Sequence, residues 1–200
     1  FVQMSTIAVF GSASRISETT PERPQTYYGS SKLKADKELV AMSDREFKAA
    51  IIRPPMAYGG GMAPGNMLRL IRLVNKHIPL PFGSARNSRD FINVKNLVEF
   101  IHLAVEKEVE GVFYPTDKVP YSTRNVVEEI SRQLGVHTIN LPSPSIFLKL
   151  IEKVRPDLYQ KLWGDVVIDR QLALSAIGYE PRYTLEDGIR EMVESFKQQK

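Results

Sequence analysis

Apolar and helical segments alternate in the first part of the chain, and this alternation constrains the fold most. Phe1–Ser5 is a strand-like run, Thr26–Glu38 is predicted to be helical, and Ala49–Arg53 is a second apolar run that ends before two prolines. A strand, a helix and a strand in this order are typical of a parallel sheet. Ligands bind at the carboxyl ends of such strands. Thr6 and Pro54–Tyr58 lie at these ends, so the sequence predicts an α/β protein with a ligand site there.

The composition excludes several classes of function. The 200 residues contain no cysteine, which excludes disulfides and thiolate metal sites and fits a reducing compartment, so we expect a cytoplasmic protein. No apolar run reaches the length of a membrane span, and we expect no membrane partner. The net charge of +4 comes from scattered lysines and arginines without an aromatic–basic stripe, so we expect no nucleic acid. The histidines, His77, His102 and His137, have no ligand spacing, and no metal site is expected.

Caps, prolines and apolar spacing predict the other elements. Thr6–Phe10 is expected to continue the first strand, and Arg15–Gln25 to be a loop because it contains two prolines. Tyr58–Pro64 is rich in glycine and lacks the Lys-Ser/Thr of a P-loop, so it is predicted to be a loop as well. Further helices are expected at Met67–Lys76 capped by Asn66, from Asn93 or Asn96 to Glu106, at Thr123–Leu134 capped by Ser122, at Pro144–Val154, from Asp169 to Gly178, and at Leu185–Lys197 capped by Thr184, with extended segments at Ser88–Val94, Gly111–Tyr114 and Val136–Leu141.

Within the first predicted helix, Tyr28 and Lys32 stand four residues apart and therefore share one helix face. A free tyrosine has a pKa of about 10, and a neighbouring cation lowers the pKa toward the range of general acid–base chemistry. The same spacing occurs by accident at Tyr114 and Lys118, where Pro115 follows the tyrosine and the segment is predicted to be a turn. The spacing alone does not decide between chemistry and chance, and the surrounding strands must.

Four stretches in order resemble the extended short-chain dehydrogenases/reductases, in particular the nucleotide-sugar epimerase group. They are STIAVFG at Ser5–Gly11, YGSSK at Tyr28–Lys32, IIRPPMAYGGG at Ile51–Gly61 and RDFINV at Arg89–Val94, and the closing segment GYEPRYTLEDGI at Gly178–Ile189 is similar too. The resemblance covers essentially the whole chain. The segment PLPFGSARNSRDFINVKNLVEFI looks most like a bacterial branch of UDP-hexose and UDP-N-acetylhexosamine 4-epimerases of surface-polysaccharide biosynthesis.

The resemblance implies the C-terminal portion of a doubly wound parallel-sheet, Rossmann-like fold with a small α/β substrate lobe. Residues 1–58 would be the second half of the dinucleotide-binding domain, and 59–200 mainly the substrate lobe, with 89–115 returning to the sheet. The chain opens with Phe in an apolar run, and we expect it to be a piece of a longer protein. Family members form dimers through the helix that carries the tyrosine, so we expect a homodimer of the intact protein.

The resemblance also implies catalytic roles. Tyr28 would take the proton from a sugar hydroxyl while hydride leaves that carbon for the nicotinamide of NAD. Lys32 would lower the Tyr28 pKa and bind the cofactor's ribose, and Thr6 would hydrogen-bond the same substrate oxygen. Ser5 could share the Thr6 role. The alternative for Thr6 is a β-favouring residue that merely ends a strand.

Binding roles follow from the same resemblance. Pro54, Pro55 and Met56 would lie beside the nicotinamide, although the two prolines could simply stop the strand. The diphosphate and the base of the nucleotide would be held by Asn66 at a helix start, Arg89, Leu80 and Phe82. Taken singly, Arg89 would more ordinarily form a surface salt bridge, and Leu80 and Phe82 would be core residues.

Departures from the family pattern limit these expectations. Ile7 and Ala8 stand where the dehydratase and decarboxylase branches carry acidic residues, which disfavours both chemistries. Met56 replaces a sugar-contacting Asn, and Asn93 and Asn96 replace the usual His and Asp. The glycine-rich turn that binds the dinucleotide is absent, so NADP is not excluded and the isolated piece is expected to be inactive.

The leading prediction is a nucleotide-sugar 4-epimerase that acts through a 4-keto intermediate with bound NAD. The first alternative is an NAD(P)H-dependent 4-keto-sugar reductase with the same Thr6, Tyr28 and Lys32. The second is a non-catalytic dinucleotide-binding protein that kept the fold.

Overall fold

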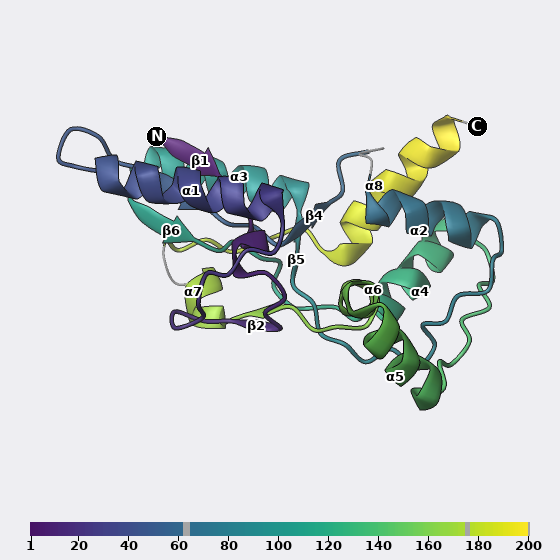
Figure 1. Cartoon of the computed structure of the whole chain (residues 1–200). Coiled ribbons are helices and arrows are strands. Elements are labelled where there is room, and N and C mark those ends of the chain that lie inside the picture. The colour runs from purple at the N-terminus through teal and green to yellow at the C-terminus, as the bar shows by residue number, and fades with distance from the viewer. Residues whose placement is uncertain (62–64, 175–176, 200) are drawn as a thin grey trace. The chain divides into compact units, whose positions relative to one another are not determined.

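The computed structural model describes residues 1–61, 65–174 and 177–199, and the chain divides into two compact units (Figure 1). Unit 1 comprises residues 1–57, 90–119 and 166–182, and unit 2 comprises 58–89, 120–165 and 183–200. Residues 166–182 were expected in the substrate lobe, but their contacts place them in unit 1. Across the described residues, no helix is both long and apolar enough to cross a membrane.

A three-stranded parallel sheet forms the centre of unit 1, as the sequence predicts. Its order is β1 (Val2–Met4), β3 (Ala50–Ile52) and β6 (Gly111–Phe113). Met4 pairs with Ile52 and Ile52 with Phe113, so the three strands end at the same edge. The middle strand β3 is fully buried, which is typical of a parallel sheet covered on both faces.

Two more strand pairs complete the strands of the described chain. β2 (Arg15–Ile16) pairs in parallel with β7 (Val167–Ile168), and β4 (Met56–Tyr58) pairs with β5 (Phe91–Asn93). The prediction of a loop throughout Arg15–Gln25 was therefore wrong at its start. Ile16 is almost fully buried against its partner strand, and one apolar residue in a polar segment is too weak a local signal for a strand.

Helices occupy most of the remaining chain (Figure 1). They are the 3₁₀ helix η1 (Ile7–Phe10), α1 (Tyr27–Met42), α2 (Asn66–Asn75), α3 (Val94–Glu106), α4 (Thr123–Leu134), α5 (Ser145–Val154), α6 (Pro156–Leu162), α7 (Arg170–Leu174) and α8 (Leu185–Gln198). Ser122 and Thr184 cap α4 and α8 as predicted, and Asn93, not Asn96, caps α3.

Several expected boundaries were wrong. Thr6–Phe10 does not continue the strand, because the Thr6 side chain caps η1. Gly65, not Asn66, is the N-cap of α2, and it offers no side-chain cap bond. Within Val136–Leu141 only Asn140 forms an isolated bridge, to Leu80. The expected helix from Asp169 ends earlier, at Leu174, and residues 175–176 of that prediction lie outside the described chain, as do 62–64 of the predicted glycine-rich loop.

Each unit has its own apolar packing. In unit 1, α3 packs on β3 and β6 through Leu97, Phe100 and Ala104, while Leu33 of α1 joins a second cluster. That cluster contains Val9, Phe10, Ile16 and Ile168. In unit 2, α4 packs against both α2 and α8. Residues buried there include Ile71, Val74, Val127, Ile130, Ile189 and Met192.

Gly29 lets α1 approach η1 closely. A Cβ at this position would lie 2.7 Å from the Ala8 carbonyl oxygen and 3.1 Å from Pro24 Cβ. Because the Ala8 oxygen belongs to the backbone, a contact of 2.7 Å with it could be relieved only if α1 moved.

We predict that Gly29→Ala destabilises the protein by about 1–3 kcal/mol, because α1 must move away from Ala8. Ser30→Ala is the matched control, since Ser30 is the next residue of α1 and is exposed, and it should change stability by less than about 0.5 kcal/mol. Urea unfolding measures both. Equal stabilities of the two variants would contradict the close approach.

The cap of α8 predicts a pH dependence. Asp187 Oδ2 accepts from the Thr184 backbone N at 2.9 Å and from its Oγ1 at 2.7 Å, and these bonds lower the pKa of Asp187. The folded state then binds fewer protons than the unfolded state, so this stability is present above the ordinary carboxyl pKa of about 3.9 and is lost as the pH falls through the lowered value. Asp187→Ala should destabilise by roughly 1 kcal/mol at neutral pH, and the difference should vanish in acid. Thermal unfolding across this pH range measures the difference, and a gap that persists in acid would contradict it.

Candidate active site

One face of α1 carries three polar side chains in successive turns. Lys32 Nζ lies 6.0 Å from the centroid of the Tyr28 ring, and it donates a hydrogen bond of 2.9 Å to the carbonyl of Met4, the last residue of β1. Tyr28 is 56% exposed, whereas Asp36, one turn beyond Lys32, is 1% exposed. The face therefore presents a phenol to solvent at one end and buries a carboxylate at the other, with the ammonium between them.

Thr6 lies two residues after β1, and the residues on both sides of it form backbone hydrogen bonds. The Ser5 N donates to the Ile52 carbonyl at 2.7 Å, and the Ile7 N donates to the Pro54 carbonyl at 3.3 Å. Thr6 Oγ1 accepts from the Ala8 N at 3.1 Å. Among the described residues the Thr6 hydroxyl proton has no acceptor, so it can be donated to a ligand. Both Thr6 and the Lys32 contact thus lie at the carboxyl end of β1.

Ser5 has a different environment from Thr6. Its side chain is buried, and its Oγ donates to Asp36 Oδ2 at 2.7 Å. This placement gives Ser5 an internal partner on α1 and not an open substrate-facing hydroxyl, contrary to the expectation that it shares the Thr6 role. The alternation of a strand explains the difference, because neighbouring side chains point to opposite sides.

A buried ion pair joins α1 to the end of β3. Arg53, the residue after β3, is 4% exposed, and its Nε lies 2.9 Å from Asp36 Oδ2. Its Nη1 lies 2.7 Å from Glu22 Oε1 and donates to Tyr114 Oη at 3.4 Å. Asp36 Oδ1 is buried and has no hydrogen-bond partner in the described chain.

Interactions within this network counteract the effect of burial on the charge of Arg53. Burial acts against the Arg53 charge, but the contacts with Tyr114, Glu22 and Asp36 outweigh it and raise the pKa of Arg53. Burial raises the pKa of the Tyr114 hydroxyl, although Arg53 acts in the opposite direction. Arg53 is therefore a permanent cation at the carboxyl edge of the sheet.

Sequence reasoning missed this network, although two signals were present. Asp36 extends the four-residue spacing of Tyr28 and Lys32, so it lies on the same face of the helix. Arg53 ends an apolar run, and a charge in a buried strand needs a partner. Neither signal identifies the partner, because Asp36 and Arg53 are distant in sequence.

The residues after Arg53 differ in exposure. Pro54 and Pro55 are buried, and the Pro54 carbonyl is engaged with the Ile7 N. Met56, at the start of β4, is 37% exposed. Of these three residues, Met56 therefore has the exposed side chain, and the two prolines are packed inside.

Unit 2 contains the four residues expected to bind the nucleotide. Asn66 is exposed at the first turn of α2. Leu80 and Phe82 are 5% and 3% exposed, and the Phe82 ring packs 5.2 Å from the Trp163 ring. Both are core residues in this structure. This agrees with the alternative prediction that they belong to the core, and not with an exposed surface that binds the base.

Arg89 is half-buried and bonded to the chain itself. Its Nη1 donates to the carbonyls of Gln160 at 2.8 Å and Gly164 at 2.7 Å. Burial lowers the pKa of Arg89, and the nearby Asp165 partly offsets this effect. In the described chain its Nε and Nη2 have no hydrogen-bond partner. Arg89 thus holds the end of α6, and two of its nitrogens remain for an anion.

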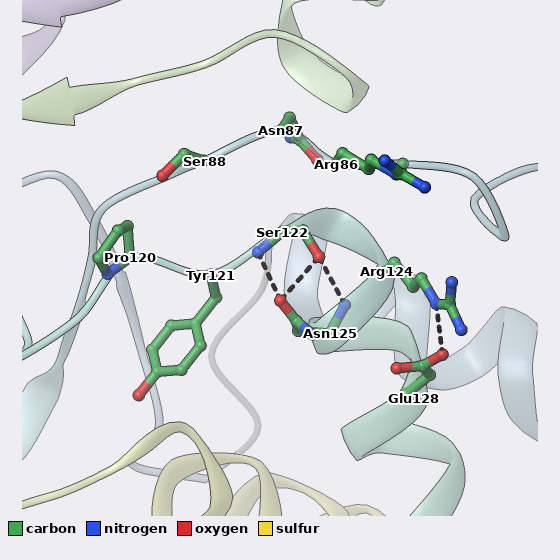
Figure 2. A pocket seen from close by; sticks show the side chains of 10 residues that line it. Arg86, Asn87, Ser88, Pro120, Tyr121, Ser122, Arg124, Asn125 and Glu128 are labelled. Carbon is green, nitrogen blue, oxygen red and sulfur yellow. Dashed lines mark hydrogen bonds and ion pairs between the residues drawn. The ribbon is translucent and has the colours of Figure 1, made fainter.

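A polar pocket of about 530 Å³ lies beside the Arg89 segment within unit 2 (Figure 2). Arg86, Asn87 and Ser88 face the first turn of α4 across it. The Ser122 and Asn125 side chains cap α4 mutually, and Arg124 pairs with Glu128 at 2.6 Å, as the dashed lines in Figure 2 show. Arg86 and Arg124 are both exposed, but Arg124 already pairs with Glu128, so Arg86 is the cation of this pocket that has no ion-pair partner among the described residues.

Residues 1–114 match the model of the NAD dependent epimerase/dehydratase family. Over 181 residues the chain is 35% identical to the UDP-glucose 4-epimerase of Vibrio cholerae. The matched region covers 88% of this chain and 55% of that protein. The chain thus spans about half the length of this relative.

Solved structures show the same fold. The UDP-glucuronic acid 4-epimerase from Bacillus cereus in complex with NAD has a TM-score of 0.76 and 22% identity, over 99% of this chain and 61% of that one. The dTDP-glucose 4,6-dehydratase from Bacillus anthracis has a TM-score of 0.72 and 22% identity, over 98% and 61%. The UDP-Glc/GlcNAc 4-epimerase from Campylobacter jejuni has a TM-score of 0.71 and 22% identity, over 99% and 64%. These similarities establish a partial Rossmann-like α/β fold, as the sequence predicts.

We predict that Arg89→Met destabilises the protein by roughly 1.5–3 kcal/mol, because two carbonyls at the end of α6 lose a charged donor. Arg86→Met is the matched control from the same segment, and since Arg86 is exposed it should change stability by less than about 0.5 kcal/mol. Chemical denaturation compares the two, and equal losses would show that the Arg89 bonds do not stabilise the fold.

Proposed function

Since the chain belongs to the NAD dependent epimerase/dehydratase family, we propose that the protein is a nucleotide-sugar 4-epimerase that uses bound NAD. The observation that carries this proposal is the shared face of Tyr28 and Lys32 on α1, anchored at the end of β1 beside Thr6. The V. cholerae relative, a UDP-glucose 4-epimerase, supports a UDP-sugar as the substrate.

The residues present fit the nicotinamide end of NAD. An exposed phenol, a half-buried ammonium and an exposed Met56 lie at the carboxyl edge of a parallel sheet, where dinucleotides bind. Tyr28, Lys32 and the segment Pro54–Met56 would hold this end, the prolines through their backbone. The glycine-rich turn for the pyrophosphate does not occur in the sequence, and we propose that these 200 residues alone bind NAD weakly and are inactive.

When bound, NAD supplies reversible acceptance of a hydride from carbon. Tyr28 takes the proton of the 4-hydroxyl as that carbon loses hydride, which leaves a ketone at C4 of the sugar. Thr6 donates its hydroxyl proton to the same oxygen, where negative charge develops during proton transfer. Lys32, which lies beside the Tyr28 ring, would hold the ribose of the cofactor. Tyr28 would return its proton to the C4 oxygen when the ketone is reduced on its opposite face with the same bound cofactor, so C4 would be inverted without net oxidation.

Substrate binding is assigned to unit 2. Arg89 has two nitrogens available for the diphosphate, and Asn66 is exposed at the start of α2. Leu80 and Phe82 would flank the base of a nucleotide that reaches them at the edge of the unit 2 core. Ile7 and Ala8 lack the acidic side chains of an elimination, which favours epimerisation over dehydration.

We extend the proposal to the setting of the enzyme. A chain without cysteine that consumes nucleotide-sugars suits the cytoplasm and polysaccharide biosynthesis. The intact protein would form a homodimer through α1, where Tyr27 is 98% exposed. Light scattering of the protein with and without Tyr27→Glu tests the dimer.

In the intact protein, Tyr28→Phe should lower turnover of UDP-glucose or UDP-N-acetylglucosamine by about 100- to 10,000-fold, because the variant loses the acid–base group. Stability should be unchanged, since the side chain is largely exposed. Tyr27→Phe makes the same chemical change at the neighbouring exposed position and should retain full activity. Turnover by Tyr28→Phe at the wild-type rate would remove Tyr28 from the mechanism.

The fate of the cofactor distinguishes the proposed epimerase from the alternative, a 4-keto-sugar reductase. A 4-keto-sugar reductase consumes added NADH or NADPH in proportion to product, whereas an epimerase recycles its NAD. Absorbance at the reduced-nicotinamide band during turnover decides between them. Dinucleotide binding without turnover of any UDP-sugar would favour the non-catalytic alternative.

A further inference from the structure

We infer that the buried Asp36–Arg53 ion pair is a positioning device that holds Tyr28 and Lys32 in place relative to Thr6. The part of this inference that concerns catalysis rests on the proposed function, and the part that concerns the position of α1 does not. Asp36 and Arg53 touch no substrate in this scheme and act through the residues beside them.

The contacts of α1 are arranged turn by turn along one face. Gly29 packs on the Ala8 carbonyl, Lys32 donates to the Met4 carbonyl, and Asp36 accepts from Ser5. All three partners belong to β1 or to the segment just after it. The first two contacts end on backbone atoms, and only the contact at Asp36 involves an ion pair with a second strand.

Each member of the network is adjacent to a proposed site residue. Ser5 precedes Thr6, Arg53 precedes Pro54, and Asp36 lies one helical turn from Lys32. The Asp36 Oδ2 atom receives both the Ser5 hydroxyl at 2.7 Å and the Arg53 Nε at 2.9 Å. One carboxylate oxygen therefore ties the helix of the phenol to the ends of both β1 and β3.

An ion pair fixes this position more narrowly than apolar packing does. Arg53 presents a rigid planar fork, with Nε on Asp36 and Nη1 on Glu22, so the carboxylates must lie in set directions. A slide of α1 by one residue moves its side chains by about 1.5 Å and rotates them by about 100°. Such a slide would take the buried Asp36 carboxylate away from Arg53 and leave it without a cation, which is strongly unfavourable.

A double variant of Asp36 and Arg53 separates the effect of the ion pair on stability from its effect on catalysis. Asp36→Asn or Arg53→Met alone leaves a buried group uncompensated and should destabilise the protein. The double variant Asp36→Asn/Arg53→Met removes the pair, and Glu22 keeps Lys37 at 3.7 Å, so thermal stability should return toward the wild-type value. Catalysis should not return with it, because the ion pair that joins α1 to the end of β3 is then missing.

The experiment uses the purified intact protein, which includes the cofactor-binding part beyond these 200 residues, and compares the wild type, both single variants and the double variant. The kcat for a UDP-sugar should fall about 100-fold in the double variant, the scale of a misplacement of about 1 Å, while KM changes less than threefold. Lys34→Gln/Glu38→Gln is the matched control, because it removes an exposed pair from the same helix. The control should retain the wild-type kcat.

Amide hydrogen exchange of residues 27–36 gives a readout that needs no turnover. Exchange in this segment should be faster in the double variant than in the wild type and the control, at equal melting temperature. If kcat and exchange both return with stability, the pair is only structural and the inference is overturned. If the intact wild-type protein turns over no UDP-sugar, the proposed function fails, and exchange alone then supports or overturns the positioning of α1.

Discussion

The buried carboxylate of Asp36 is the constraint on which the catalytic half of this protein depends. A charge can be buried only beside a partner that satisfies it, and Arg53 and Ser5 together meet that requirement. Because these partners end two neighbouring parallel strands, the requirement also determines where α1 lies on the sheet. The exposed phenol of Tyr28 is a consequence of this arrangement, since it stands two turns from the buried end of the same face.

The two units contribute different chemistry. Unit 1 contains the phenol, the ammonium and the hydroxyl to which the proposed mechanism assigns proton exchange at one carbon. Unit 2 contains the cationic Arg89, whose Nη1 is committed to the carbonyls of Gln160 and Gly164. An arginine that holds its own chain with one nitrogen and keeps others for an anion needs little reorganisation when a diphosphate binds, which is the advantage of a preorganised site.

Sequence reasoning was most successful where a local rule determines the outcome. The caps Ser122 and Thr184 and the parallel order of the first strands follow from short patterns, and the structure confirms them. It failed where a short element is stabilised from elsewhere in the chain. Ile16 forms a strand only because Ile168 pairs with it, and no window of sequence contains both. For Phe82 the sequence left two alternatives, a core residue or a base-binding residue, because Trp163, which packs on its ring, is distant in sequence.

The sequence by itself determined that Tyr28, Lys32 and Asp36 share a helix face, because the period of the α-helix is a local property. It also determined that one parallel strand is followed by Thr6 and the other by the pair of prolines. Only the tertiary structure decided which of these groups meets solvent and which is buried. Ser5 and Thr6 are neighbours in sequence, yet one binds Asp36 inside and the other keeps a proton for a ligand. The physical reason is that burial and charge pairing depend on strands brought together by the sheet, and the partner of Asp36 stands 17 residues away.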